Sequence, residues 1–117
     1  MPHAVINGEI AVEDIFTRLN PIFIKDNANI VKTKEFYLSR DKNVMLVEII
    51  IIDRSRKTEF IAMISRRDDG VVVRIYPGED VEKTDGVKRS LAEIAKQLLI
   101  LFEESKLGKT NLNQFFS

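Results

Sequence analysis

The sequence predicts an α+β domain with a short N-terminal helix, an antiparallel β-meander of four or five strands, and a long C-terminal helix packed on one face of the sheet. Three apolar runs of β-type residues lie close together at residues 44–52, 60–64 and 71–76, and short charged turns separate them. One long segment with apolar residues at helical spacing follows the last run. Connections this short join antiparallel neighbours, and 117 residues suffice for one hydrophobic core.

The first predicted helix covers residues 12–19. Its apolar residues recur at three- and four-residue steps, and they are Val12, Ile15, Phe16 and Leu19. Asn20-Pro21 ends this helix, because proline cannot continue the backbone hydrogen bonds. The residues before it carry the turn signal Asn7-Gly8 and are predicted to form either a small strand or an ordered turn.

The meander is predicted to begin with an extended segment at residues 22–25 and a strand at residues 30–38. Its turns are expected at residues 39–43, 53–57 and 66–70, which are rich in charged and turn-forming residues. Centring the strand pairs on these turns sets the register. It places Lys34 opposite Glu48 on the neighbouring strand.

Alternation of side chains then sorts the sheet into two faces. The face assigned to the long helix carries Met45, Val47, Ile49, Ile51, Ile61, Met63, Val71, Val73 and Ile75. The other face carries Phe36, Leu38, Val44, Leu46, Ile50, Phe60, Ile64, Val72 and Tyr76, crossed by a polar line of Lys34, Glu48, Ala62 and Arg74. The short helix can shield only part of this second face. The remainder is predicted to be a pocket, a subunit interface or a groove for a partner.

The long helix is expected to start near Thr84 or Asp85, or as late as Ser90, and to end at Lys106 to Gly108. Its apolar stripe comprises Val87, Leu91, Ile94, Ala95, Leu98, Leu101 and Phe102. Ile100 lies on the polar side of the helix and needs an apolar cover. The tail residues Leu112, Phe115 and Phe116 are predicted to supply it. The chain is thus one domain, 1–117, with a tail at 108–117 that is either flexible or exchanged with a partner.

Composition narrows the function. Eighteen basic and eighteen acidic residues cancel, so the chain lacks the positive field that drives non-specific binding to nucleic acid. The absence of cysteine excludes disulfides and thiolate sites, and a single histidine, His3, argues against a histidine-based triad or zinc site. No cofactor motif, signal peptide or membrane segment is visible, so we expect a soluble cytoplasmic protein.

The strongest candidate site surrounds Glu48. A carboxylate inside such an apolar strand loses solvation unless cations compensate it, and Lys34 and Arg74 are the cations expected beside it. A structural ion pair across the strands is the favoured interpretation. If the site is functional, Lys34 and Arg74 bind an anionic ligand, and Tyr76 and Phe36 form its walls.

A second candidate lies at one end of the sheet, where two turns bring together Arg40, Lys42, Arg66 and Arg67. Guanidinium groups suit phosphate recognition. Acidic residues occupy the same turns, so a solvated charged surface is the favoured interpretation and nucleic-acid binding is not expected to be strong.

The function that the sequence favours is a non-enzymatic, homodimeric binding or adaptor module that uses the mixed apolar and charged sheet face. A homodimer or another protein partner would cover that face, because few monomers leave such a surface open. The alternatives are a ligand-binding or enzymatic pocket at Glu48, Lys34 and Arg74, and weak nucleic-acid or phosphate binding through the turn arginines.

Overall fold

The computed structural model describes residues 1–116 and confirms an α+β fold with an antiparallel sheet. Two α-helices, α1 (Val12–Arg18) and α2 (Asp85–Leu101), pack against one sheet. In the described part of the chain the sheet has seven strands: β1 (His3–Asn7), β2 (Phe23–Asp26), β3 (Asn29–Leu38), β4 (Val44–Asp53), β5 (Arg56–Arg67), β6 (Gly70–Ile75) and β7 (Lys106–Thr110). A short 3-10 helix, η1 (Asn113–Phe115), follows.

The predicted strand number is wrong because both ends of the chain join the sheet. The strand order is β2-β3-β4-β5-β6-β1-β7, so β1 lies between β6 and the edge strand β7. The meander from β2 to β6 is as expected. The long helix is therefore not the C-terminal element, since β7 and η1 come after it.

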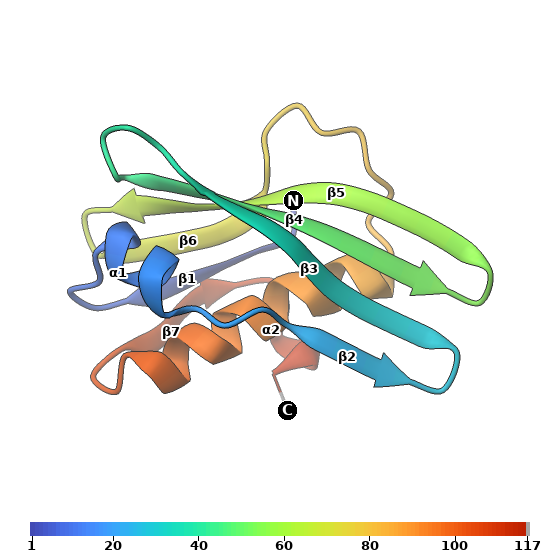
Figure 1. Ribbon diagram of the computed structural model, residues 1–117. Coiled ribbons are helices and arrows are strands. Elements are labelled where there is room, and N and C mark those ends of the chain that lie inside the picture. The colour runs from blue at the N-terminus through green and yellow to red at the C-terminus, as the bar shows by residue number, and fades with distance from the viewer. Residues whose placement is uncertain (117) are drawn as a thin grey trace.

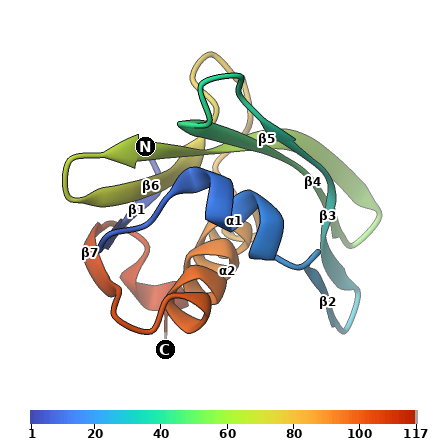
Figure 2. The same cartoon turned by 60° about the vertical axis from the view of Figure 1, so that its left-hand side comes forward.

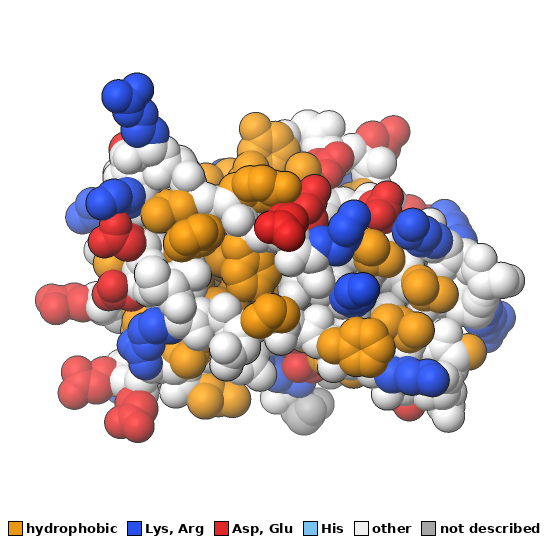
Figure 3. All heavy atoms as spheres, in the orientation of Figure 1, with side chains coloured by type: hydrophobic (Ala, Val, Ile, Leu, Met, Phe, Trp, Pro, Cys, Tyr) orange, Lys and Arg blue, Asp and Glu red, His pale blue; other side chains and the backbone are white. Residues whose placement is uncertain are grey.

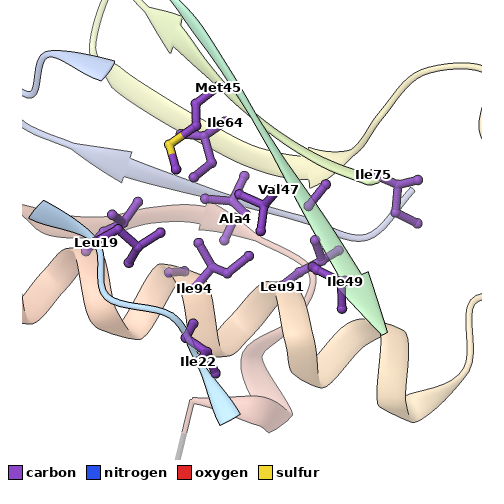
Figure 4. Packing of buried hydrophobic residues seen from close by; sticks show 14 of the residues in the cluster. Ala4, Leu19, Ile22, Met45, Val47, Ile49, Ile64, Ile75, Leu91 and Ile94 are labelled. Atoms are coloured by element: carbon purple, nitrogen blue, oxygen red, sulfur yellow. The ribbon is translucent and has the colours of Figure 1, made fainter. Parts of the chain in front are cut away.

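The sheet curls around α2 (Figures 1 and 2). Both helices lie inside this curl, so we call the side of the sheet that faces α2 the inner face and the opposite side the outer face. Val12 and Ile15 of α1 are buried in the same core as α2. The expectation that the short helix shields part of the second face is wrong. Figure 4 shows Leu19 and Ile22, which follow α1, close to Ile94 of α2.

The boundaries of α2 follow its capping chemistry. Thr84 is the N-cap, and its hydroxyl accepts a hydrogen bond from the Val87 amide at 3.3 Å. A start at Thr84 or Asp85 is therefore confirmed, and Ser90 lies inside the helix, where its hydroxyl donates to the Val87 carbonyl. The helix ends at Leu101, earlier than predicted, because residues from Lys106 onward pair with β1 instead.

The inner faces of β4 and β6 are predicted correctly, but that of β5 is not. Met45, Val47, Ile49 and Ile51 of β4 are buried, as are Val71, Val73 and Ile75 of β6. On β5 the inner residues are Phe60, Ala62 and Ile64. The β4–β5 turn is tighter than expected, with Arg54 in the left-handed region at φ 54°, so Glu48 pairs with Ile61 and the β5 faces are exchanged. The β5–β6 turn shifts the register by one residue in the opposite direction, so the two faces of β6 are as predicted.

A bulge in β3 changes the predicted face of its last residues. The register shifts between Thr33 and Phe36, after which Phe36 pairs with Val47 and Leu38 with Met45 on the inner side. Thr33 is buried at the bulge, and its hydroxyl accepts a hydrogen bond from the Ile22 amide at 2.9 Å. The bulge consequently brings Tyr37 to the outer face.

The tail packs on its own chain. Leu112 is fully buried, and Phe115 and Phe116 are half-buried against the core. Ile100 remains 69% exposed, so the described part of the tail does not cover it. Within residues 1–116, neither α-helix combines the length and the apolar character that crossing a lipid bilayer requires.

Candidate functional site

Neither α-helix of the described residues lies on the outer face of the sheet (Figure 2). Strands β4, β5 and β6 supply its centre, namely Leu46, Glu48, Ile50, Ile61, Met63, Val72 and Arg74. Tyr37 and Tyr76 flank this centre and are 48% and 42% exposed. Most of the apolar side chains here are only half-buried, by one another and by the polar groups between them.

The outer face continues onto the β2–β3 side of the sheet. Phe23 pairs with Lys32, and Lys32 pairs with Ile50, so these three side chains form one row across the strands. Phe23 is 62% exposed. The right-hand half of Figure 3, over β2 and β3, shows apolar side chains with basic ones between them. This surface is therefore amphipathic along its whole width.

Glu48 accepts a hydrogen bond from the Tyr37 hydroxyl, with 3.2 Å between the phenol oxygen and Oε1. Loss of solvation raises the pKa of Tyr37, and the hydrogen bond to Glu48 and the negative charges of Glu48 and Glu35 raise it further. Tyr37 was missed from the sequence because the bulge in β3 exchanges it with Phe36. No sequence signal marks that bulge.

The ion pairs predicted between Glu48 and the cations Lys34 and Arg74 are not formed among residues 1–116. Lys34 lies in the β3 bulge opposite Glu48 and lines the same small hollow, but it pairs with Glu59, at 3.8 Å between Nζ and Oε1. Arg74 pairs across the strands with Met63, not with Ala62, which faces inward. Within residues 1–116 no ion pair links Glu48 to either cation. Arg74 Nε is buried there without a hydrogen-bond partner.

A small hollow lies beside Glu48. Its volume is about 170 Å³, and its polar lining comprises Lys34, Glu48, Glu59 and Glu79. Glu79 is occupied structurally, because its Oε1 accepts a hydrogen bond from the Ile61 amide at 2.8 Å. Sites for small molecules are commonly about 300 Å³ or more. No group of three or more potential metal ligands forms among the described residues.

The basic turns do meet at one end of the sheet. The Arg66 amide donates to the Asn43 carbonyl at 3.1 Å, and Lys42, Arg66 and Arg67 line one open hollow next to α1. Arg40 is not part of its lining. Lys42 is paired with Glu13 at 2.8 Å, which raises the pKa of Lys42.

Neighbouring carboxylates further reduce the free charge at these turns. Arg67 is paired with Asp69 at 3.0 Å. Asp41 accepts hydrogen bonds from the Ser39 hydroxyl and the Asn43 amide, and these bonds lower the pKa of Asp41. The arrangement resembles a self-neutralised turn surface more than a phosphate site.

The contact between Tyr37 and Glu48 gives a direct test of this geometry. Replacing Glu48 by glutamine is expected to lower the pKa of Tyr37, because it removes the negative charge that disfavours the phenolate. The chain has two tyrosines, so a Tyr76→Phe background leaves Tyr37 as the only phenol to titrate. Phenolate absorbance against pH measures the change.

The folded state favours the protonated Tyr37 phenol, because its pKa is raised. The resulting stabilisation is present below the ordinary tyrosine pKa of about 10 and is lost as the pH rises through the folded value. A Glu13→Gln variant, which alters the distant pair with Lys42, serves as the control. A Tyr37 titration unchanged by Glu48→Gln would contradict the hydrogen bond.

Comparison with protein-family models, with curated proteins and with solved structures found no match for the chain. The function is therefore inferred from the outer face itself: its half-buried apolar side chains, the buried unpaired nitrogen of Arg74 and the adjacent carboxylate of Glu48.

Proposed function

We propose that the protein is a non-enzymatic homodimeric binding module in which two copies meet through their outer faces. The observation that carries the proposal is the position of both described helices inside the curl, which leaves the apolar centre of the outer face without a covering helix. A sheet with apolar residues on both sides is normally covered on both. The small hollow beside Glu48 offers less support for an enzymatic pocket.

Apolar burial supplies the driving force. Leu46, Ile50, Ile61 and Val72 are half-buried in the single chain, so a second copy would remove further apolar area from water. Each square ångström contributes about 25 cal/mol. The half-exposed rings of Tyr37 and Tyr76 at the edge suit an interface, because tyrosine combines a large apolar ring with a polar tip.

The charges of the outer face are complementary to those of the same face in a second copy. Glu48 and Arg74 lie on β4 and β6, on either side of β5, and each belongs to the same outer surface. A two-fold axis in the plane of the interface, crossing β5 between Ile61 and Met63, would bring Glu48 of each copy opposite Arg74 of the other. Arg74 would thereby gain an acceptor, and the zero net charge of the chain produces no overall repulsion.

The curl of the sheet limits the size of this interface. Two convex surfaces touch mainly along their central strands, so the contact area is expected at the low end of specific interfaces, below about 1,200 Å² in total. Such interfaces are weak and reversible. We expect a dissociation constant of roughly 1–100 μM.

Reversing the charges tests the pairing. Glu48→Arg and Arg74→Glu are each expected to weaken the dimer by at least about tenfold, because each places two like charges opposite each other in the symmetric interface. The double variant Glu48→Arg, Arg74→Glu restores opposite charges and should recover most of the affinity. Sedimentation equilibrium over a concentration series measures all four proteins.

Matched controls carry the same charge changes away from the outer face. Glu104 in the turn after α2 and Arg66 near the end of β5 are exposed, so Glu104→Arg and Arg66→Glu should leave the dissociation constant unchanged. A wild-type protein that is monomeric up to about 1 mM would overturn the dimer. Failure of the double variant to recover affinity would exclude this pairing of Glu48 with Arg74.

A further inference from the structure

A cleft of about 510 Å³ lies on the opposite side of the sheet from the proposed dimer interface. It is bounded by the tip of the β4–β5 hairpin, by the β2–β3 hairpin and by the first turn of α2. In Figure 1 these hairpins form the right-hand end of the sheet and extend past the start of α2. The volume falls in the range of small-molecule sites, about 300–1,000 Å³.

The floor of the cleft is apolar. Val31 and Ile51 pair across β3 and β4 on the inner face and are nearly buried, and Ile24 of β2 extends the same surface. Gly86 allows α2 to approach this floor, because a Cβ there would lie 2.8 Å from Ile51 Cγ2. The helix thus closes one end of an apolar trough and leaves the rest open.

Three arginines line the rim, and they differ in how they are held. Arg56 pairs with Glu82 at 2.6 Å, and Arg89 pairs loosely with Asp26 at 3.7 Å. No ion pair to Arg54 occurs within residues 1–116, and this residue sits at the hairpin tip in the left-handed region, at φ 54°. The guanidinium of Arg54 is therefore free to bind a ligand. Arg89 can leave Asp26 at a small cost in free energy.

The rim also limits the charge of a ligand. Asp26, Asp53 and Asp85 line the same cleft, so the three arginines and three carboxylates balance. The lining therefore has no net positive charge with which to attract a polyanion. A single carboxylate can instead bind the fork of Arg54, in the bidentate geometry that guanidinium groups favour.

We propose that this cleft binds a small amphipathic monoanion, a carboxylate attached to an apolar body. The carboxylate contacts Arg54, with Arg89 beside it, and the apolar body lies on Ile24, Val31 and Ile51. This site is independent of the dimer, because its residues belong to the hairpin ends and the inner face.

Isothermal titration calorimetry with octanoate as the probe tests the proposal on the full chain. Octanoate is expected to bind with one site per chain. Octanol, which keeps the body without the charge, and acetate, which keeps the charge without the body, should each bind at least about tenfold more weakly. Octanoate that binds no more tightly than octanol would overturn the role of the arginines.

Arg54 variants locate the site. Arg54→Gly removes the guanidinium at a position whose backbone suits glycine, so the fold should be retained, and octanoate affinity should fall by at least about tenfold. Arg54→Lys keeps the charge without the fork and should give an intermediate loss. Arg66→Gly, at the opposite end of the sheet, is the matched control.

Two outcomes separate this site from the dimer. Arg54→Gly that binds octanoate as wild type does would place the ligand elsewhere and overturn the proposal. Arg74→Glu, which weakens the dimer, should leave octanoate binding unchanged, so that failure of one proposal is distinguishable from failure of the other.

Discussion

The Gly70→Ala variant is expected to lose roughly 4 kcal/mol of unfolding free energy, one of the largest effects for a single methyl group in this chain. Gly70 begins β6 with φ +152°, and an added Cβ would lie 1.9 Å from the Ile6 carbonyl oxygen. That oxygen belongs to the backbone of β1, which is held between β6 and β7. The clash between the added Cβ and this oxygen can therefore be relieved only if β1 moves. Urea unfolding followed by circular dichroism measures the loss.

Gly78 supplies the matched control. It also has a positive φ, +92°, but an added Cβ there would meet no atom within 4 Å. Gly78→Ala should therefore show backbone strain alone, about 1–2 kcal/mol. Equal losses in the two variants would mean that the close approach of β1 to β6 is not what requires glycine at position 70.

Local patterns predicted the parts of the fold that local contacts determine. From Val44 to Ile52 the residues of β4 alternate between half-buried and buried, as period-two hydrophobicity requires. On α2 the predicted apolar stripe includes Val87, Leu91, Ile94 and Leu98, and all four are buried. Each of these patterns lies within one element, so no knowledge of the distant chain is needed to recognise it.

The strands at the chain ends depend on distant partners and were not predictable in this way. In β7 the sequence Lys106-Leu107-Gly108-Lys109-Thr110 has no β-type alternation, yet it pairs with β1 at the far end of the chain. Hydrogen bonds from the Thr110 hydroxyl to the His3 carbonyl and from the His3 amide to Asn111 Oδ1 fix that pairing. Such side-chain contacts stabilise a strand whose sequence alone favours a helix C-terminus.

For the candidate site, the sequence predicted which surface carries it but not which side chains lie next to each other. The unmatched apolar outer side of β4 and β6 was visible in the alternation, and the structure leaves that side without a helix. Lys34 remains beside Glu48, but the other predicted neighbours differ, because they depend on the β3 bulge and the tight β4–β5 turn, each of which shifts the register by one residue. A shift of one residue exchanges the two faces, so Tyr37 replaces Phe36 beside the carboxylate.

The two proposed sites use opposite sides of the same sheet. Ile50 and Ile51 are consecutive in β4, with Ile50 on the outer face and Ile51 in the floor of the cleft. Pairing of two outer faces leaves the cleft open to solvent in each copy. The proposed ligand binding and the proposed dimer formation would therefore be compatible, and changes in either can be measured in the presence of the other.

Replacing Leu112 by alanine is expected to reduce the unfolding free energy by about 2–5 kcal/mol. Leu112 is fully buried in the core cluster although it lies only a few residues from the end of the chain. Its amide donates to the Thr110 hydroxyl at 3.0 Å, and its carbonyl accepts from the Phe115 amide at 2.9 Å, so it anchors both β7 and η1. Loss of the side chain leaves a cavity beneath the tail and weakens the docking of Phe115 and Phe116.

Ile100→Ala is the control for Leu112→Ala, because it also shortens an aliphatic side chain in the C-terminal part of the chain. Ile100 is 69% exposed, so its truncation should change the unfolding free energy by no more than about 0.5 kcal/mol. Denaturant unfolding of both variants at one protein concentration gives the comparison. If Leu112→Ala proved as mild as Ile100→Ala, the tail would not be part of the folded core, and the pairing of β7 with β1 would have to be stable without the anchor that Leu112 provides.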